Sequence, residues 1–139
     1  QGGAQLYETL HPSERQHAQD LPGHQMTRQA LADLVKRAGF TDINTAVAII
    51  LAESGGVPNA RARNSQEDSV GLFQINLRVH PQYSAEQMAD PEQNALAAQI
   101  LSKWGTDWRP WSTWWKDPDK HLGPGQGRYT LFLPRTKSV

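Results

Sequence analysis

Apolar residues recur at helical spacing in the first half of the chain and predict two helices there. The first is expected over Thr27–Ala38, with a threonine suited to the N-cap position and Gly39 where helices commonly end. The second is expected over Asp42–Ser54. Its segment Ala46–Ala52 is apolar on every side, so a buried strand is a competing interpretation, but the alanines and the length favour a helix. We therefore expect a central, buried helix.

The pattern is mixed further along the chain. A polar stretch leads into Val70–Ile75, which predicts a loop and a small hairpin with one short apolar strand. A short helix is expected over Ser84–Met88, and Asp90-Pro91 begins a longer helix that Gly105 would end. Tyr129–Leu133 is compatible with a short strand. The predicted fold class is mainly α (α+β), with a small β-hairpin.

The 139 residues correspond to one domain. Residues 1–25 are rich in Gln, Gly and Pro and predict a flexible arm or linker, residues 26–122 the folded domain, and residues 123–139 a C-terminal extension. The spacing of His11, His17 and His24 matches no standard set of metal ligands, so we expect solvated histidines and no metal.

Composition excludes several classes of protein. Fourteen basic residues balance fourteen acidic ones, which argues against a dedicated nucleic-acid binder. Without cysteine there is no disulfide scaffold, zinc finger or thiol nucleophile. The longest apolar run has seven residues, so no membrane span is expected. The start at Gln1, without a signal-peptide pattern, is expected of a processed protein, an expressed fragment or a domain excised from a larger protein.

Glu53 has the surroundings that point most clearly to chemistry. It follows the apolar segment, near the C-terminal end of the predicted helix, with Ile49 and Ile50 four and three residues before it. Apolar neighbours and the negative helix end both disfavour the charged carboxylate, so its pKa is expected to rise. A general acid for glycosidic cleavage needs such a retained proton. The alternative is a helix-terminal glutamate that reaches water.

Three segments, in this order, resemble the lysozyme-like soluble lytic transglycosylases: Ala-Glu-Ser-Gly-Gly at 52–56, Ser-Val-Gly-Leu-Phe-Gln-Ile-Asn at 69–76 and Asp-Pro-Glu-Gln-Asn-Ala at 90–95. In that family a Glu-Ser pair ends a buried helix, a Gly-Leu-Met/Phe-Gln element forms part of the sugar cleft, and Asp-Pro-x-x-Asn begins a later helix. The resemblance covers about residues 27–115 and implies a lysozyme-like fold.

The chain departs from the family in one segment. Many members carry Ala-Tyr-Asn-Ala-Gly, whose tyrosine helps to position the catalytic glutamate. Here Trp108–Trp114 stands instead and resembles the variant of phage-associated and actinobacterial cell-wall-degrading domains. The residue that orients Glu53 is therefore open, with Tyr129 and Tyr83 as candidates.

The resemblance implies cleavage of the β-1,4 bond between N-acetylmuramic acid and N-acetylglucosamine in peptidoglycan. In a lytic transglycosylase, Glu53 would act first as acid and then as base, and would produce 1,6-anhydromuramoyl ends. A hydrolase would use a second carboxylate, for which Glu67 and Asp68 are candidates. Asn76 stands where hydrolytic goose-type relatives can carry aspartate, which favours the single-glutamate mechanism. A non-catalytic glycan-binding module is the alternative from another class.

The resemblance and side-chain chemistry together predict a set of substrate contacts. Ser54 would bond near Glu53 or to a sugar, Gly71 would allow close approach, and the Gln74 amide suits an acetamido group. Of the five tryptophans in residues 104–115, we expect two or three in the core and at most two on sugar. The predicted substrate-binding residues are Ser54, Gly71, Gln74, Asn76, Trp111 and Tyr129.

The partners and location follow from the same resemblance. The partner would be the glycan strands of peptidoglycan, with no cofactor and no nucleic acid. The implied location is extracytoplasmic, in the cell wall or periplasm, or within a phage virion. A place in a larger virion or secretion-machine assembly is a further hypothesis, supported by the residues 1–25 arm and the tryptophan-rich segment.

Overall fold

Helices α2 (Arg28–Arg37) and α3 (Ile43–Ser54) form where helical spacing predicts them, in a computed structural model that describes residues 23–134. The Thr27 hydroxyl accepts a hydrogen bond from the amide of Ala30, and the Asp42 carboxylate accepts one from the amide of Thr45. Each bond satisfies a backbone donor that a helix start leaves unpaired. The predicted N-cap at Thr27 is therefore confirmed, and Asp42 caps α3 in the same way.

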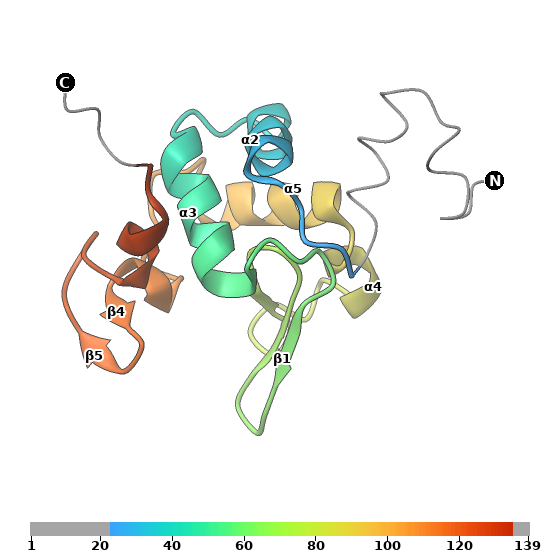
Figure 1. Cartoon of the computed structure of the whole chain (residues 1–139). Coiled ribbons are helices and arrows are strands. Elements are labelled where there is room, and N and C mark those ends of the chain that lie inside the picture. Colours follow the sequence, from blue (N-terminus) through green and yellow to red (C-terminus); the bar gives the residue numbers. More distant parts are fainter. Residues whose placement is uncertain (1–22, 135–139) are drawn as a thin grey trace.

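Helix α3 lies at the centre of the molecule, between α2 on one side and the C-terminal elements on the other (Figure 1). All five residues from Ala46 to Ile50 are buried, which confirms the prediction of a central helix. The competing interpretation as a buried strand is excluded. Gly55 ends α3 in the left-handed conformation, with φ of 67°, where glycine carries no steric penalty.

A small antiparallel sheet projects from the body below α3 (Figure 1). Its strands, in the order β1-β2-β3, are Arg61–Arg63, Asp68–Val70 and Ile75–Asn76. The predicted hairpin is thus part of a three-stranded sheet. The single apolar strand expected over Val70–Ile75 is wrong, because φ of 88° at Gly71 and 52° at Gln74 turns the chain between β2 and β3.

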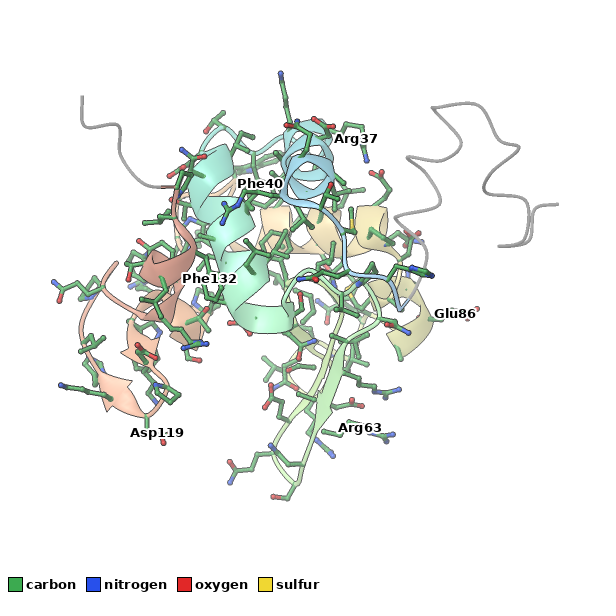
Figure 2. The ribbon with its side chains drawn as sticks, viewed as in Figure 1. Arg37, Phe40, Arg63, Glu86, Asp119 and Phe132 are labelled. Carbon is green, nitrogen blue, oxygen red and sulfur yellow. The ribbon has the colours of Figure 1, made fainter. Side chains whose placement is uncertain are left out.

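The remaining elements surround α3 and pack the aromatic residues. They are α4 (Ala85–Met88), α5 (Pro91–Leu101), the 3-10 helix η2 (Ser112–Trp114), the two-stranded β4 (Lys116–Asp117) and β5 (Lys120–His121), and the 3-10 helix η3 (Arg128–Phe132). Figure 2 shows Phe40 turned inward, where its ring stacks 5.7 Å from the ring centroids of both Phe73 and Trp108. Trp108 and Trp111 are both buried, so two of the five tryptophans belong to the core, as expected.

Two local predictions in the second half are wrong. Tyr129–Leu133 is no strand: most of it forms η3, which packs against α3 and buries Tyr129. The domain boundaries expected at residues 25 and 122 stay predictions. Helix α5 ends at Leu101 instead of Gly105, because positive φ at Lys103 and Trp104 breaks the helix earlier.

Other predictions concern residues at the edge of, or outside, the described range. The predicted arm, with His11 and His17, lies outside residues 23–134 except for its last three residues, which include an exposed His24.

Among the described helices, none combines the length and apolar character needed to cross a membrane.

Candidate active site

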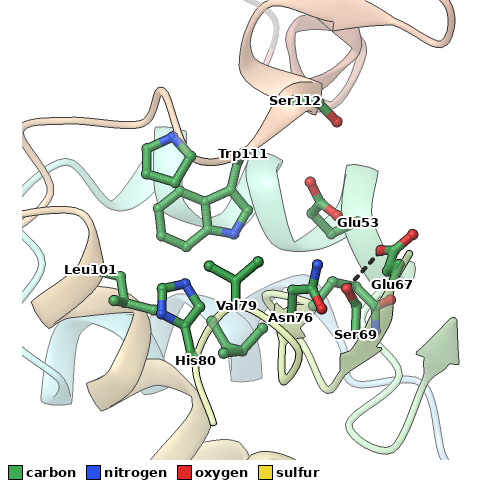
Figure 3. Close-up of a pocket in the computed structure, with 12 residues that line it drawn as sticks. Glu53, Glu67, Ser69, Asn76, Val79, His80, Leu101, Trp111 and Ser112 are labelled. Carbon is green, nitrogen blue, oxygen red and sulfur yellow. Dashed lines mark hydrogen bonds between the residues drawn. The ribbon is translucent and has the colours of Figure 1, made fainter. Parts of the chain in front are cut away.

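Glu53 lies in the last turn of α3 and faces a pocket of about 460 Å³ (Figure 3). The pocket runs between the end of α3, the turn into β3 and the segment that leads into η2. Both polar and apolar side chains line it, which suits a ligand with both hydroxyl groups and apolar ring faces. The lining residues are Glu53, Glu67, Ser69, Gln74, Ile75, Asn76, Val79, His80, Leu101, Pro110, Trp111 and Ser112.

The pKa of Glu53 is raised from 4.5 to about 7. The largest cause is desolvation, because the carboxyl is only partly exposed and stands on a helix whose Ile49 and Ile50 are fully buried. The negative charge of Glu67 raises the pKa further, whereas hydrogen bonds from Thr113 lower it. The rise in pKa agrees with the local sequence, and it lets a substantial share of the carboxyl keep its proton near neutral pH, as a general acid needs.

Glu67 is a second carboxylate in the same pocket, as its place in the loop suggested. Its Oε2 accepts a hydrogen bond of 2.6 Å from the hydroxyl of Ser69, which is itself buried (Figure 3). Asp68 is directed elsewhere: it accepts two hydrogen bonds from Arg61 and is absent from the pocket lining. Of the two candidates for a second carboxylate, only Glu67 lines the pocket together with Glu53.

The turn that carries Gln74 is fixed from below by Asn94, in the first turns of α5. The buried Asn94 amide accepts from the Phe73 amide at 2.8 Å and donates to the carbonyls of Val70 and Met88. All these bonds are made in a water-free environment, where unpaired polar groups are costly. The side chain of Asn94 therefore holds both ends of the Val70–Phe73 segment in place.

Gln74 and Asn76 present different groups to the pocket. The Gln74 Nε2 donates to the carbonyls of Ala60 and Gly71, so both of its hydrogens are engaged and only the amide oxygen is left for a ligand. In Asn76 it is the oxygen that is engaged, by the amides of Asp68 and Arg78. Asn76 thus offers its NH₂ group, a donor, to the pocket.

Trp111 forms one wall of the pocket and is itself almost completely buried (Figure 3). Its indole Nε1 donates to the Phe73 carbonyl at 2.8 Å, and its ring packs edge-on against Trp108 with centroids 5.2 Å apart. These contacts join the tryptophan segment to the turn that carries Gln74. Trp111 therefore supports the pocket as well as lining it.

A buried helix that ends in a glutamate of raised pKa, beside a small sheet and a pocket, is the arrangement that the sequence motifs predicted. Residues 32–113, more than half of the chain, match the family model described as a lysozyme-like domain. The protein belongs to this family. No curated protein matches the chain. This match confirms the predicted lysozyme-like family and the predicted α+β fold class. It also indicates a glycan-cleaving enzyme whose substrate is peptidoglycan.

Several predicted contacts of this lysozyme-like domain lie apart from the pocket lining. The Ser54 hydroxyl donates to the Ile50 carbonyl and accepts from the Gly56 amide, so it completes the end of α3. Tyr129 is buried in η3, and its hydroxyl donates to the Gly125 carbonyl. Gly71 lies beneath the turn, against Asn94. Gln74, Asn76 and Trp111 are the predicted substrate-binding residues that do reach the pocket.

The partner of Glu53 is a residue that the sequence did not reveal. The Thr113 hydroxyl donates to Glu53 Oε2 at 2.8 Å, whereas the two tyrosines considered for this role, Tyr83 and Tyr129, have no hydrogen bond to Glu53. Thr113 lies within the tryptophan segment that replaces the family's tyrosine-bearing motif. The replaced motif indicates that the partner of Glu53 lies in this segment, but it does not distinguish Thr113 from the neighbouring residues.

His80 is another residue of the pocket lining, and no sequence motif pointed to it. Within residues 23–134, no three histidine, aspartate or glutamate side chains gather in a group that could hold a metal ion. The absence of a cofactor stays a prediction.

Proposed function

We propose that the protein is a lytic transglycosylase that cleaves the β-1,4 bond between N-acetylmuramic acid and N-acetylglucosamine. The observation that carries this proposal is Glu53, whose pKa burial raises to about 7, in a pocket where Asn76, not aspartate, follows the Gly-Leu-Phe-Gln turn. An amide cannot act as the general base that would activate water. The chemistry therefore falls to Glu53.

In the proposed cycle Glu53 transfers one proton in each direction. Its carboxyl protonates the glycosidic oxygen as the bond from that oxygen to the muramoyl C1 breaks. The carbonyl oxygen of the substrate's own N-acetyl group then bonds to C1 and stabilises its positive charge. The muramoyl O6 next attacks C1 and displaces this oxygen, while the Glu53 carboxylate accepts the O6 proton. The products are a 1,6-anhydromuramoyl end and a regenerated Glu53.

The polar groups of the pocket are suited to such a substrate. The Asn76 amide supplies a donor and the Gln74 amide oxygen an acceptor, which complement the carbonyl and N–H of an acetamido group. The apolar side chains of Val79, Leu101 and Trp111 offer surface for the sugar rings. We therefore infer that the acetamido sugars bind along this wall.

A second candidate function is hydrolysis of the same bond, and the presence of Glu67 in the pocket is the observation that favours it. Glu67 as a carboxylate could accept a proton from water that attacks C1. The hydrogen bond from Ser69 to Oε2 holds this carboxylate at the pocket.

Mass spectrometry of the fragments released from purified peptidoglycan separates these functions. Transglycosylation gives anhydromuramoyl ends, and hydrolysis gives reducing ends that are heavier by one water. We expect anhydromuramoyl ends from the wild type and from Glu67→Gln, and no fragments from Glu53→Gln. Reducing ends that disappear in Glu67→Gln would establish the hydrolase instead. Glu86→Gln, at an exposed α4 residue that Figure 2 shows pointing away from the body, is the matched control.

We also propose that the protein acts outside the cytoplasm, in the bacterial cell wall or as part of a phage virion. Support comes from the peptidoglycan substrate that the family indicates. Detection of the chain in purified virions would support the virion. Its recovery from the cell-wall fraction of uninfected bacteria would argue for a bacterial enzyme.

A further inference from the structure

The hydroxyl of Thr113 reaches Glu53 from a distant part of the chain. Sixty positions separate the two residues, yet Thr113 Oγ1 donates to Glu53 Oε2 at 2.8 Å. Both side chains are partly buried, so the bond is shielded from the competition of bulk water. This hydrogen bond engages Oε2 and leaves Oε1 as the other oxygen of the Glu53 carboxyl.

Helix η2, which carries Thr113, is held on both sides. Before it, Trp111 is anchored through its indole N–H to the Phe73 carbonyl. After it, the Gly127 amide donates to the Trp114 carbonyl at 2.9 Å. Gly127 lies so close to η2 that an added Cβ would stand 2.3 Å from the Thr113 carbonyl oxygen. These contacts leave Thr113 little freedom to move away from Glu53.

We propose that Thr113 is a positioning residue that holds Glu53 Oε2, so that Oε1 is the oxygen that exchanges protons with the substrate. The inference rests on the proposed function, because it assigns Thr113 a part in the acid and base steps of Glu53. Thr113 itself touches the carboxyl and does not line the pocket. Thr113 thus takes the role of orienting Glu53, for which the sequence offered Tyr83 and Tyr129 as candidates.

The hydroxyl has a second consequence for a carboxyl that must both give and take a proton. As a donor, Thr113 favours the charged form of Glu53 and so opposes the effect of desolvation on the pKa. Without this bond Glu53 would retain its proton to higher pH. It would then be a weaker acid, and its two oxygens would be interchangeable. Turnover would fall while substrate binding, which uses other side chains, would not.

The test compares Thr113→Val, which removes the hydroxyl at nearly constant shape, with Thr113→Ser, which keeps it. The pKa of Glu53 is measured by NMR titration of its ¹³C-labelled carboxyl, and kcat and KM are measured on soluble peptidoglycan fragments. We expect Thr113→Val to raise the pKa by about one unit and to lower kcat about tenfold or more at unchanged KM. Thr113→Ser should restore both to within about twofold of the wild type.

An unchanged Glu53 pKa and kcat in Thr113→Val would overturn the proposal, as would a Thr113→Ser variant as impaired as Thr113→Val. If Thr113→Val does not fold, Thr113→Ala removes the same hydroxyl at a partly exposed position and carries the same expectation. The NMR titration does not need activity, so it tests the Thr113 contact even if the proposed function fails. That failure would be recognised separately, by fragments released by Glu53→Gln.

Discussion

Gly71 and Asn94 are in direct contact beneath the active-site turn. A Cβ added to Gly71 would lie 2.2 Å from Asn94 Nδ2 and 2.0 Å from the Met88 carbonyl oxygen, closer than any real contact. Gly71 also has φ of 88°, a conformation that other residues adopt only with strain. Glycine is needed here for both reasons, and the close contact allows Asn94 to bond to both ends of the turn and to the Met88 carbonyl.

Gly71→Ala is therefore expected to lower the free energy of unfolding by about 3 kcal/mol or more, as strain and steric overlap add. Gly55→Ala is the matched control, since Gly55 also has positive φ but no atom within 4 Å of its added Cβ. It should cost only about 1 kcal/mol. Urea unfolding of both variants checks the difference. Equal losses would mean that the contact with Asn94 contributes nothing.

Trp111 is expected to contribute to stability and to activity, whereas the exposed Trp104 is not. Trp111→Phe leaves the buried Phe73 carbonyl without its indole donor, which should cost about 1–3 kcal/mol and lower kcat/KM by disturbing the pocket wall. Trp104→Phe alters a side chain that is 68% exposed and should change stability by less than about 0.5 kcal/mol. Denaturant unfolding and fragment release measure the two effects. Similar behaviour of the two variants would refute the role of Trp111.

The sequence predicted those parts of the molecule that depend on local spacing. Helices α2 and α3 have apolar stripes and capping residues within their own segments, such as Thr27 and Asp42. The environment of Glu53 was equally local, because the buried Ile49 and Ile50 come from the same helix. The family followed from three motifs in a fixed order.

The remaining features arise from contacts between distant segments. The bond from Thr113 to Glu53 joins residues sixty positions apart, and no local pattern distinguishes this threonine from other surface hydroxyls. The Gln74 amide was expected to suit an acetamido group, but the sequence does not show that the folded turn brings the Ala60 carbonyl to its nitrogen and leaves only its oxygen for a ligand. Tyr129 has strand-like neighbours, yet packing against α3 selects a 3-10 helix. Such outcomes depend on tertiary packing, which overrides local preference.

The rate of cleavage should fall as the pH rises through about 7, because Glu53 must be protonated for the first step. Above this pKa, kcat/KM is expected to decrease about tenfold per pH unit. Glu67→Gln removes a negative charge that raises the Glu53 pKa, so it should move this alkaline limb of the pH profile of kcat/KM to lower pH. The exposed Glu86→Gln should leave the limb in place. A profile that is flat to pH 9 would contradict Glu53 as the acid.

Glu53→Gln is expected to inactivate the enzyme and yet to stabilise the fold at alkaline pH. The folded-state pKa of Glu53, about 7, lies above its value of 4.5 for an unperturbed carboxyl. Below pH 4.5 both states hold the proton and the burial carries no ionisation penalty. As the pH rises through this window the unfolded chain ionises first, so wild-type stability falls by up to about 3 kcal/mol.

Glutamine does not titrate, so the variant escapes this loss. We expect the unfolding free energies of Glu53→Gln and the wild type to differ little at pH 4, and the variant to be more stable by about 2–3 kcal/mol at pH 8. Denaturant unfolding at the two pH values measures the change, and all other titrating groups cancel in the comparison. A difference that is the same at both pH values would show that the Glu53 pKa is not raised by folding.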